Sequence, residues 1–191
     1  MFGAGVKLCG ATSSRMTDHN ETPCPCGGTL RPIKRKEYDA SVEIGIPLLL
    51  TGDVLGLGCE NCGAVAIPGR VLEAATEEAV ELVLRLGRLL SGREAKFLRK
   101  AALGLGQEEL ANKLGLSRPT VARWEAEKSL SAEHDFELRG LVLGVLLQRS
   151  RSGAPPWSRR HSALVQLATD ILPGARSSPA PDDLPPLRIA A

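Results

Sequence analysis

The stretch that decides the fold runs from Phe97 to Leu130 and reads FLRKAALGLGQEELANKLGLSRPTVARWEAEKSL. Its apolar residues recur at three- and four-residue steps, which predicts short amphipathic helices. Gly115 divides the second helix from the third, because a tight turn between helices favours a residue that accepts a positive φ. Ser117 is a good N-cap, and Pro119 falls in the next first turn, where its missing N–H breaks no hydrogen bond. The segment therefore predicts a helix followed by two helices that meet at a tight turn.

We expect these helices at residues 93–103, at 107–114 and from Ser117 onward. Helical spacing places one apolar side chain from each turn toward a shared interior. The side chains expected to point inward are Phe97, Leu98, Ala101, Ala102, Leu110, Leu114, Val121 and Trp124.

Burying those side chains leaves polar residues on the outside of the third helix. In a helix-turn-helix unit, the N-terminal half of this helix enters the major groove of DNA. Arginine suits that position because its forked donors match the O6 and N7 atoms of guanine. Gln107 begins the second helix, where its amide and the helix N-terminus are placed to contact a phosphate. The predicted DNA-binding residues are Gln107, Lys113, Ser117, Arg118, Pro119, Thr120, Arg123 and Lys128. The alternative is an ordinary helical bundle with solvated arginines.

The same stretch resembles the Xre-type, or lambda-repressor-like, helix-turn-helix family. The matching residues are Gln107, Glu109-Leu110-Ala111, Leu114-Gly115, Ser117, Thr120-Val121 and Trp124-Glu125. The resemblance implies a lambda-repressor-like all-α fold that binds double-stranded DNA. It also implies that Glu125 pairs with a basic residue of the first helix, which would be Lys100 in this chain.

Two close pairs of cysteines precede the helical stretch, at Cys24-Pro-Cys26 and Cys59-Glu-Asn-Cys62. Four thiolates in two turns suit tetrahedral Zn²⁺. A bound ion would stabilise a β module too small to fold on its apolar content alone. We therefore expect all four cysteines to hold a structural zinc ion. The single residue between the first two leaves His19 as a substitute ligand. A disulfide, separate buried thiols or a redox pair would also be compatible with this spacing.

The Cys-Pro…Cys-Gly opening and the later Cys-x-x-Cys resemble a YgiT-type zinc finger. Together with the Xre-type stretch, residues 23–147 are similar to the MqsA antitoxin family. The resemblance implies a zinc module that binds a ribonuclease toxin. It also implies a C-terminal domain that forms a homodimer and represses the promoter of its own operon.

The sequence as a whole predicts an α+β protein in five stretches. These are a flexible N-terminal extension (1–20), a zinc-binding β module (21–70), a connecting amphipathic helix (71–92), the helix-turn-helix domain (93–148) and a Pro/Ser/Arg-rich, mostly disordered tail (149–191). Strands are expected at 30–38, 42–50 and 64–67, with a turn at Gly52-Asp53, and a helix is possible within the tail at 158–171. Met16 is an alternative start of the chain.

Composition narrows the class of function. The formal net charge of +2 carries little weight, because DNA contacts are made by placed groups within residues 93–128. No apolar run reaches the roughly 18 residues of a membrane span, so we expect a cytoplasmic protein. Three scattered histidines build no catalytic arrangement, so we expect no enzyme. The sequence thus predicts a dimeric transcriptional repressor. The alternative is an antitoxin whose main role is to bind a toxin and whose DNA binding serves autoregulation.

Overall fold

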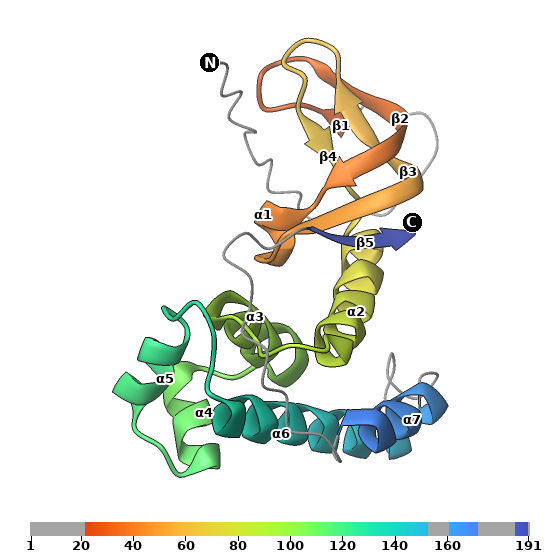
Figure 1. The fold of residues 1–191 in the computed structure, drawn as a ribbon. Coiled ribbons are helices and arrows are strands. Elements are labelled where there is room, and N and C mark those ends of the chain that lie inside the picture. The colour runs from red at the N-terminus through yellow and green to blue at the C-terminus, as the bar shows by residue number, and fades with distance from the viewer. Residues whose placement is uncertain (1–21, 153–160, 172–185, 191) are drawn as a thin grey trace.

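The computed structural model describes residues 22–152, 161–171 and 186–190. A curved β-sheet lies at one end of the molecule and a group of helices at the other, with helix α2 between them (Figure 1). The sheet carries the four-cysteine cluster and precedes the helical region in the chain. The predicted α+β fold class is therefore confirmed. The N-terminal extension, His19 and Met16 lie outside the described residues.

The sheet is built mainly from antiparallel neighbours. Its strands are β1 (Thr22–Pro23), β2 (Thr29–Asp39), β3 (Leu48–Cys59), β4 (Val65–Ala66) and β5 (Leu187–Ala190). The order is β1-β2-β3-β4, and β5 pairs in parallel with the beginning of β3. Strands β2 and β3 pair as one long antiparallel ribbon, which makes up most of the sheet. The cysteines lie at the end of this ribbon that is farther from the helices.

The strand expected at 42–50 is partly wrong, because the observed strand β3 begins later than the sequence predicted. Ser41–Ile44 form the short helix α1, and β3 starts only at Leu48. The cause is local hydrogen bonding: the Asp39 carboxylate accepts from the Ser41 N–H, and the Ser41 hydroxyl accepts from the Leu48 N–H. Such bonds favour a turn over a ladder. The expected turn at Gly52-Asp53 is also wrong, because both residues lie inside β3.

Helix α2 runs from Gly69 to Arg85 and buries one apolar face. The connecting helix was expected over 71–92, but residues 86–91 are not helical. The reason is a strong start signal for the next helix. The Ser91 hydroxyl accepts from the Glu94 N–H, and the Glu94 carboxylate accepts from the Ser91 N–H. This capping box fixes the beginning of α3 at the following residue.

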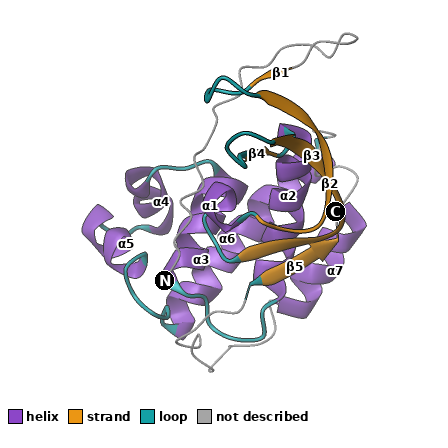
Figure 2. Cartoon of the chain, turned by 90° about the horizontal axis from the view of Figure 1, so that it is seen from above, coloured by secondary structure: helices purple, strands orange, loops and turns teal. Residues whose placement is uncertain are grey.

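The remaining helices form the other end of the molecule, and residues 92–151 within it are called the reader below, after the DNA-binding role that the sequence predicts. They are α3 (Gly92–Phe97), the π-helical segment η1 (Leu98–Leu103), α4 (Gln107–Leu114), α5 (Arg118–Trp124), α6 (Ala132–Arg151) and α7 (His161–Ile171). Figures 1 and 2 place α4 and α5 at one side of this layer and α7 at the other. Among the described residues, no helix is long and apolar enough to cross a membrane.

The C-terminal segment has more structure than the sequence predicted. Helix α6 extends to Arg151, α7 falls within the stretch where a helix was considered, and β5 joins the sheet. Ile189 of β5 is only 3% exposed. A strand that depends on a partner more than a hundred residues away leaves no local signal in the sequence.

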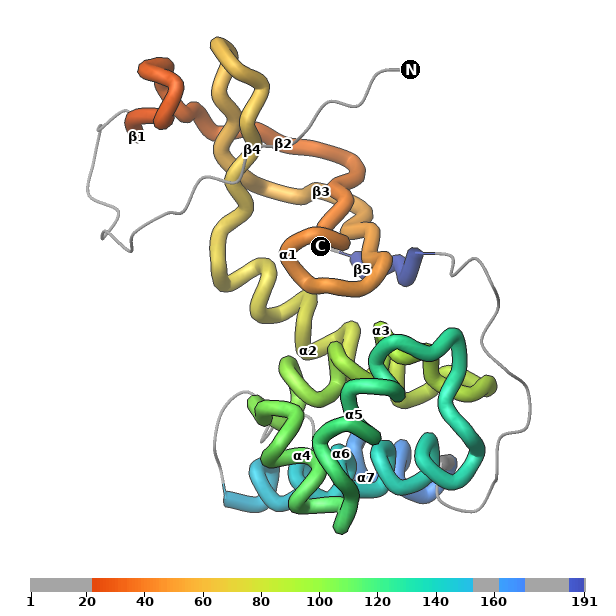
Figure 3. Tube along the Cα trace, turned by 90° about the vertical axis from the view of Figure 1, so that its left-hand side faces the viewer, coloured from red at the N-terminus to blue at the C-terminus, as the bar shows by residue number. Residues whose placement is uncertain are grey.

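The buried apolar side chains form two separate clusters. The large one runs without a break from the lower half of the sheet through α2 to the reader helices, and it includes Leu50, Val80 and Leu98. The small one consists of Cys24, Leu30 and Cys59, with little apolar cover. The sheet is therefore anchored in the large core at one end only. Figure 3 shows the cysteine end extending away from the helices.

Candidate nucleic-acid interface and metal centre

Helices α4 and α5 meet at the tight turn that the sequence predicted. Gly115 ends α4 in the left-handed region, with φ of +68°. The Ser117 hydroxyl then accepts from the Thr120 N–H at 3.3 Å and caps α5. Pro119 lies in the first turn of α5, where no helical N–H is needed.

The inner face of this unit is closely packed. Val121 and Trp124 of α5 are 1% and 3% exposed, and Leu110 of α4 is 2% exposed. The Trp124 ring also contacts the ring of His134, with centroids 4.2 Å apart. With these side chains buried, the opposite face of α5 is fixed toward solvent.

That outward face carries most of the predicted DNA-binding side chains. Ser117, Arg118, Pro119 and Arg123 are exposed, and Thr120 is half-buried with its hydroxyl 2.8 Å from that of Ser117. The two flanking lysines, Lys113 and Lys128, are exposed as well. Both guanidinium groups can therefore be reached from outside without any rearrangement of the helix.

Gln107 is held by the interior of the reader. Its amide nitrogen donates to the Glu125 carboxylate at 2.8 Å, and Arg99 donates to the same carboxylate at 2.5 and 3.1 Å. Burial opposes the charge on Glu125, but hydrogen bonds from Arg99 and Gln107 hold its pKa below the ordinary 4.5. The start of α4 is thereby tied to the end of α5. The phosphate contact of Gln107 stays a prediction.

The expected partner of Glu125 is corrected by this geometry. The resemblance implied Lys100, but Lys100 is exposed and Arg99 makes the ion pair. The segment Leu98–Leu103 is π-helical, and a π turn changes which residues share a face. Arg99 also donates to the Leu105 carbonyl at 2.6 Å, so it joins three parts of the reader.

A second buried network was missed by sequence reasoning. Arg139 of α6 is fully buried and pairs with Asp135 one turn earlier, at 2.9 Å. It also donates to the carbonyls of Val83 and Leu84 at the end of α2, while Asp135 accepts from the Leu90 N–H at 2.8 Å. An Asp and Arg four residues apart inside an apolar stripe was the signal that could have revealed it. The network locks α2 onto the reader.

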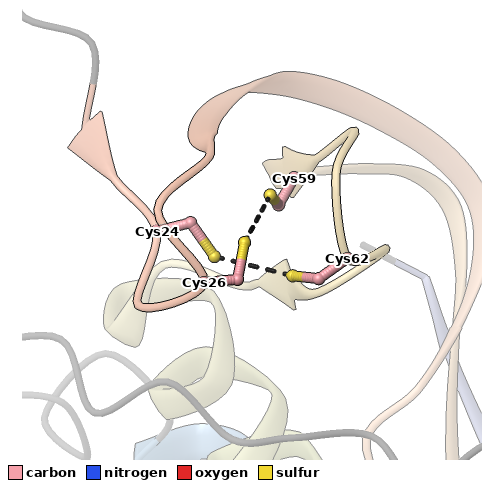
Figure 4. Close-up of side chains that lie close together, drawn as sticks. All are labelled: Cys24, Cys26, Cys59 and Cys62. Atoms are coloured by element: carbon pink, nitrogen blue, oxygen red, sulfur yellow. Dashed lines mark hydrogen bonds between the residues drawn. The ribbon is translucent and has the colours of Figure 1, made fainter.

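The four cysteines of the two pairs come together at the far end of the sheet. Their sulfur atoms all lie within 4.8 Å of one another (Figure 4). The Cys24–Cys62 and Cys26–Cys59 sulfur distances are 3.6 and 3.5 Å. All four are free thiols, so these residues form no disulfide. The short first pair contributes both sulfurs, as the sequence predicted.

The cluster fits a tetrahedral metal ion. A Zn–S bond of about 2.3 Å in a regular tetrahedron gives sulfur atoms about 3.8 Å apart, close to the two separations above. A backbone hydrogen bond at Gly28, together with the neighbouring thiols, lowers the pKa of Cys26 to about 6, whereas the pKa values of Cys24 and Cys62 are raised by burial and by the neighbouring thiols against an opposing backbone hydrogen bond. A thiol that loses its proton readily is suited to bind a cation. These residues could therefore hold a metal ion of the zinc type.

The turns around the sulfurs require glycine. Gly27 and Gly63 adopt φ of +85° and +72° as the chain folds back after each pair. A Cβ on Gly28 would lie 3.0 Å from the Cys59 sulfur and 2.9 Å from the Cβ of Asn61. The amide of Asn61 also lies 3.6 Å from the Cys26 sulfur. Side chains larger than hydrogen at Gly28 would push the two halves of the cluster apart.

Comparison with known proteins identifies the reader alone. Residues 96–134 match the family model of helix-turn-helix domains called HTH_3. No curated protein and no solved structure gives a significant match to the chain. The matched segment begins in α3 and ends in the first turn of α6, so it covers the whole α4–α5 unit. This match supports a DNA-binding regulator.

Proposed function

We propose that this protein is a sequence-specific transcriptional repressor that binds double-stranded DNA as a homodimer. The observation that carries the proposal is the exposure of Arg118 and Arg123 on α5, inside a segment that matches helix-turn-helix domains. Arginine at this position of the unit reads guanine by two parallel hydrogen bonds. A dimer would read two half-sites about 34 Å apart, one helical turn of DNA.

The test is to select the preferred duplex from a random pool and then to measure how each base change alters binding. Replacing Arg118 or Arg123 by Ala should cost about 1–3 kcal/mol, and the preference should be lost at one base position for each variant. Arg70→Ala is a matched control, because Arg70 is exposed on α2 and outside the matched segment. If neither reader variant changes the base profile, the assignment is wrong.

We also propose that the four-cysteine cluster holds a structural Zn²⁺ ion through Cys24, Cys26, Cys59 and Cys62. The separations between the sulfur atoms support this, together with the glycine turns that bring the two pairs to one place. Purified protein should contain about one zinc per chain, as measured by elemental analysis. A metal-free protein with a fully ordered cysteine end would contradict the proposal.

The second candidate function is that of an antitoxin that masks a toxin with its metal module. Besides the family resemblance, one observation favours it: Leu55 on the β2–β3 ribbon is 60% exposed. This apolar side chain is therefore accessible to a partner protein that contacts the metal module. If a toxic small protein is encoded beside this gene, Leu55→Asp should weaken its neutralisation and leave DNA binding unchanged. If the variant neutralises the toxin as well as the wild type does, Leu55 is not part of the toxin-binding surface.

We propose a binding role and no catalytic one, since the candidate sites are a DNA-reading face and a closed thiolate cluster. We place this role in the cytoplasm, the compartment in which such a regulator would meet its operator. An assay of the selected duplex for cleavage or modification by the metal-loaded protein tests the binding role: the duplex should be recovered intact.

A further inference from the structure

Three basic side chains of the reader take no part in the contacts described above. Arg93 and Lys96 lie on α3 and Lys100 lies in η1, at steps of three and four residues. All three are exposed, whereas every other residue between Arg93 and Lys100 is buried. Residues three and four apart share one side of a helix, so the three cations form a single outward row. We call this row the basic stripe.

The basic stripe borders helix α5, whose outer face carries the predicted base-reading arginines. At the start of the stripe, the Gly92 N–H donates to the Glu127 carbonyl, just after α5, at 3.1 Å. Near its other end, the Arg99 guanidinium pairs with the carboxylate of Glu125, the C-cap of α5. Burial opposes the charge on Glu125, and the charge of Lys96 joins the hydrogen bonds that hold its pKa below the ordinary 4.5. The stripe therefore lies beside the C-terminal end of α5 (Figure 1).

The positive charge of the stripe is not compensated by the acidic side chains around it. The Glu94 carboxylate is held by Arg88 at 2.6 Å. The Glu125 carboxylate is held by Arg99 at 2.5 Å, while Lys100 stays outside on the π-helical turn of η1. Within residues 22–152, 161–171 and 186–190, no member of the stripe forms an ion pair. A row of such cations attracts a polyanion whose charges are closely spaced.

We propose that the basic stripe binds the phosphate backbone of the duplex whose bases the outer face of α5 reads. From Arg93 to Lys100 the helix rises by about 10 Å. Successive phosphates of one strand advance by about 3.4 Å along the duplex axis, so the three long side chains can reach neighbouring phosphates. Such contacts position the protein on the duplex and carry no base information. The inference rests on the proposed DNA binding and adds the residues that hold one flank of the site.

The test measures the affinity for the selected duplex over a range of salt concentrations. The triple variant Arg93→Gln, Lys96→Gln, Lys100→Gln should bind about 100-fold more weakly at physiological salt. Its plot of log affinity against log salt should also be flatter by about 2.7, because each lost phosphate contact removes about 0.9 from the slope. Each single substitution should flatten the plot by about 0.9. All three positions are exposed, so the fold, checked by thermal unfolding, should be unchanged.

The matched control removes the same charge away from α5, in the triple variant Lys34→Gln, Lys36→Gln, Arg70→Gln. These residues are exposed on β2 and at the start of α2, outside the reader. The control should keep the salt slope of the wild type. If the stripe variant and the control have the same slope, the inference is overturned.

The base preference separates a failure of this inference from a failure of the proposed function. The stripe variant should weaken binding to selected and random duplexes alike. If the wild type shows no base preference, but loss of the stripe still flattens the slope, the sequence-specific repressor is refuted and the phosphate contact stands. If the preference is present and the slope does not change, the stripe alone is refuted. A wild type that binds no duplex refutes both.

Discussion

The two ends of the β2–β3 ribbon are stabilised by different means. The end near α2 belongs to a core that continues into the reader, and its buried charges are paired, as with Arg139 and Asp135. The cysteine end has a cluster of only three buried residues, two of which are cysteines. Apolar burial therefore suffices at one end, whereas the other depends on what the thiols bind. Metal loss and core damage should therefore unfold different parts of the chain.

The largest effect should follow removal of the metal from the cysteine end. A chelator, or Cys59→Ser, should abolish the order of β1, β4 and both cysteine turns, since structural zinc contributes about 10 kcal/mol or more in small modules. Amide NMR signals of that end should collapse, while those of α4 to α6 persist. Cys9→Ser is the matched control, because Cys9 lies outside the two close pairs in the sequence. If the amide signals of α4 to α6 were lost together with those of the cysteine end, the two ends would not be stabilised by different means.

The next largest effect should follow Arg139→Met. The substitution leaves the Asp135 carboxylate buried without its ion-pair partner, which typically costs about 3–5 kcal/mol. Denaturant unfolding of the reader measures it. Arg151→Met, at the exposed end of the same helix, should change stability by less than about 0.5 kcal/mol. Equal effects of the two substitutions would show that the buried network does not hold α2 to the reader.

A smaller effect is expected for Gly92→Ala at the start of α3. A Cβ there would lie 2.3 Å from the Trp124 carbonyl oxygen, a backbone atom that cannot move aside cheaply. We expect a loss of about 1–3 kcal/mol in reader stability. Gly144→Ala on α6 meets nothing within 4 Å and should raise stability by up to about 1 kcal/mol. A neutral result at Gly92 would mean that α3 and the end of α5 are less tightly joined.

The smallest expected effect is the pH dependence of the stability of the reader. The pKa of Glu125 is held below 4.5, so its charge stabilises the folded state above that pH, and the contribution is lost as pH falls through the folded-state pKa. Glu125→Gln should therefore be less stable than the wild type at pH 7 by about 1 kcal/mol. The difference should shrink steadily below pH 4.5. A difference that stays constant from neutral pH down to about pH 3 would contradict the role of the charge.

Local signals made much of the reader predictable. Gly115, Ser117 and Pro119 each restrict the backbone at their own position, so the α4–α5 turn could be predicted from the chain alone. The cysteine cluster was predictable because four thiols in two close pairs suit a tetrahedral metal ion. In both cases the information lies within a few residues of the structure it determines.

The features that could not be predicted depend on competition between local signals or on contacts between residues far apart in the chain. The end of α2 is decided by the Ser91–Glu94 capping box, which overrides an apolar stripe that continues past Arg85. The partner of Glu125 is decided by the π turn in η1, which periodicity does not show. The position of β5 depends on an acceptor edge far away in the sequence. None of these outcomes is set by the propensity of the residues involved.

The central claim is that the outer face of α5 distinguishes one DNA sequence from another. The most direct measurement is the ratio of affinities for the selected duplex and for random duplex, at fixed salt. The wild type should prefer the selected duplex by about 1,000-fold or more. The double variant Arg118→Ala with Arg123→Ala should lose most of this ratio, whereas Lys113→Ala should weaken both duplexes alike. An unchanged ratio in the double arginine variant would contradict the account.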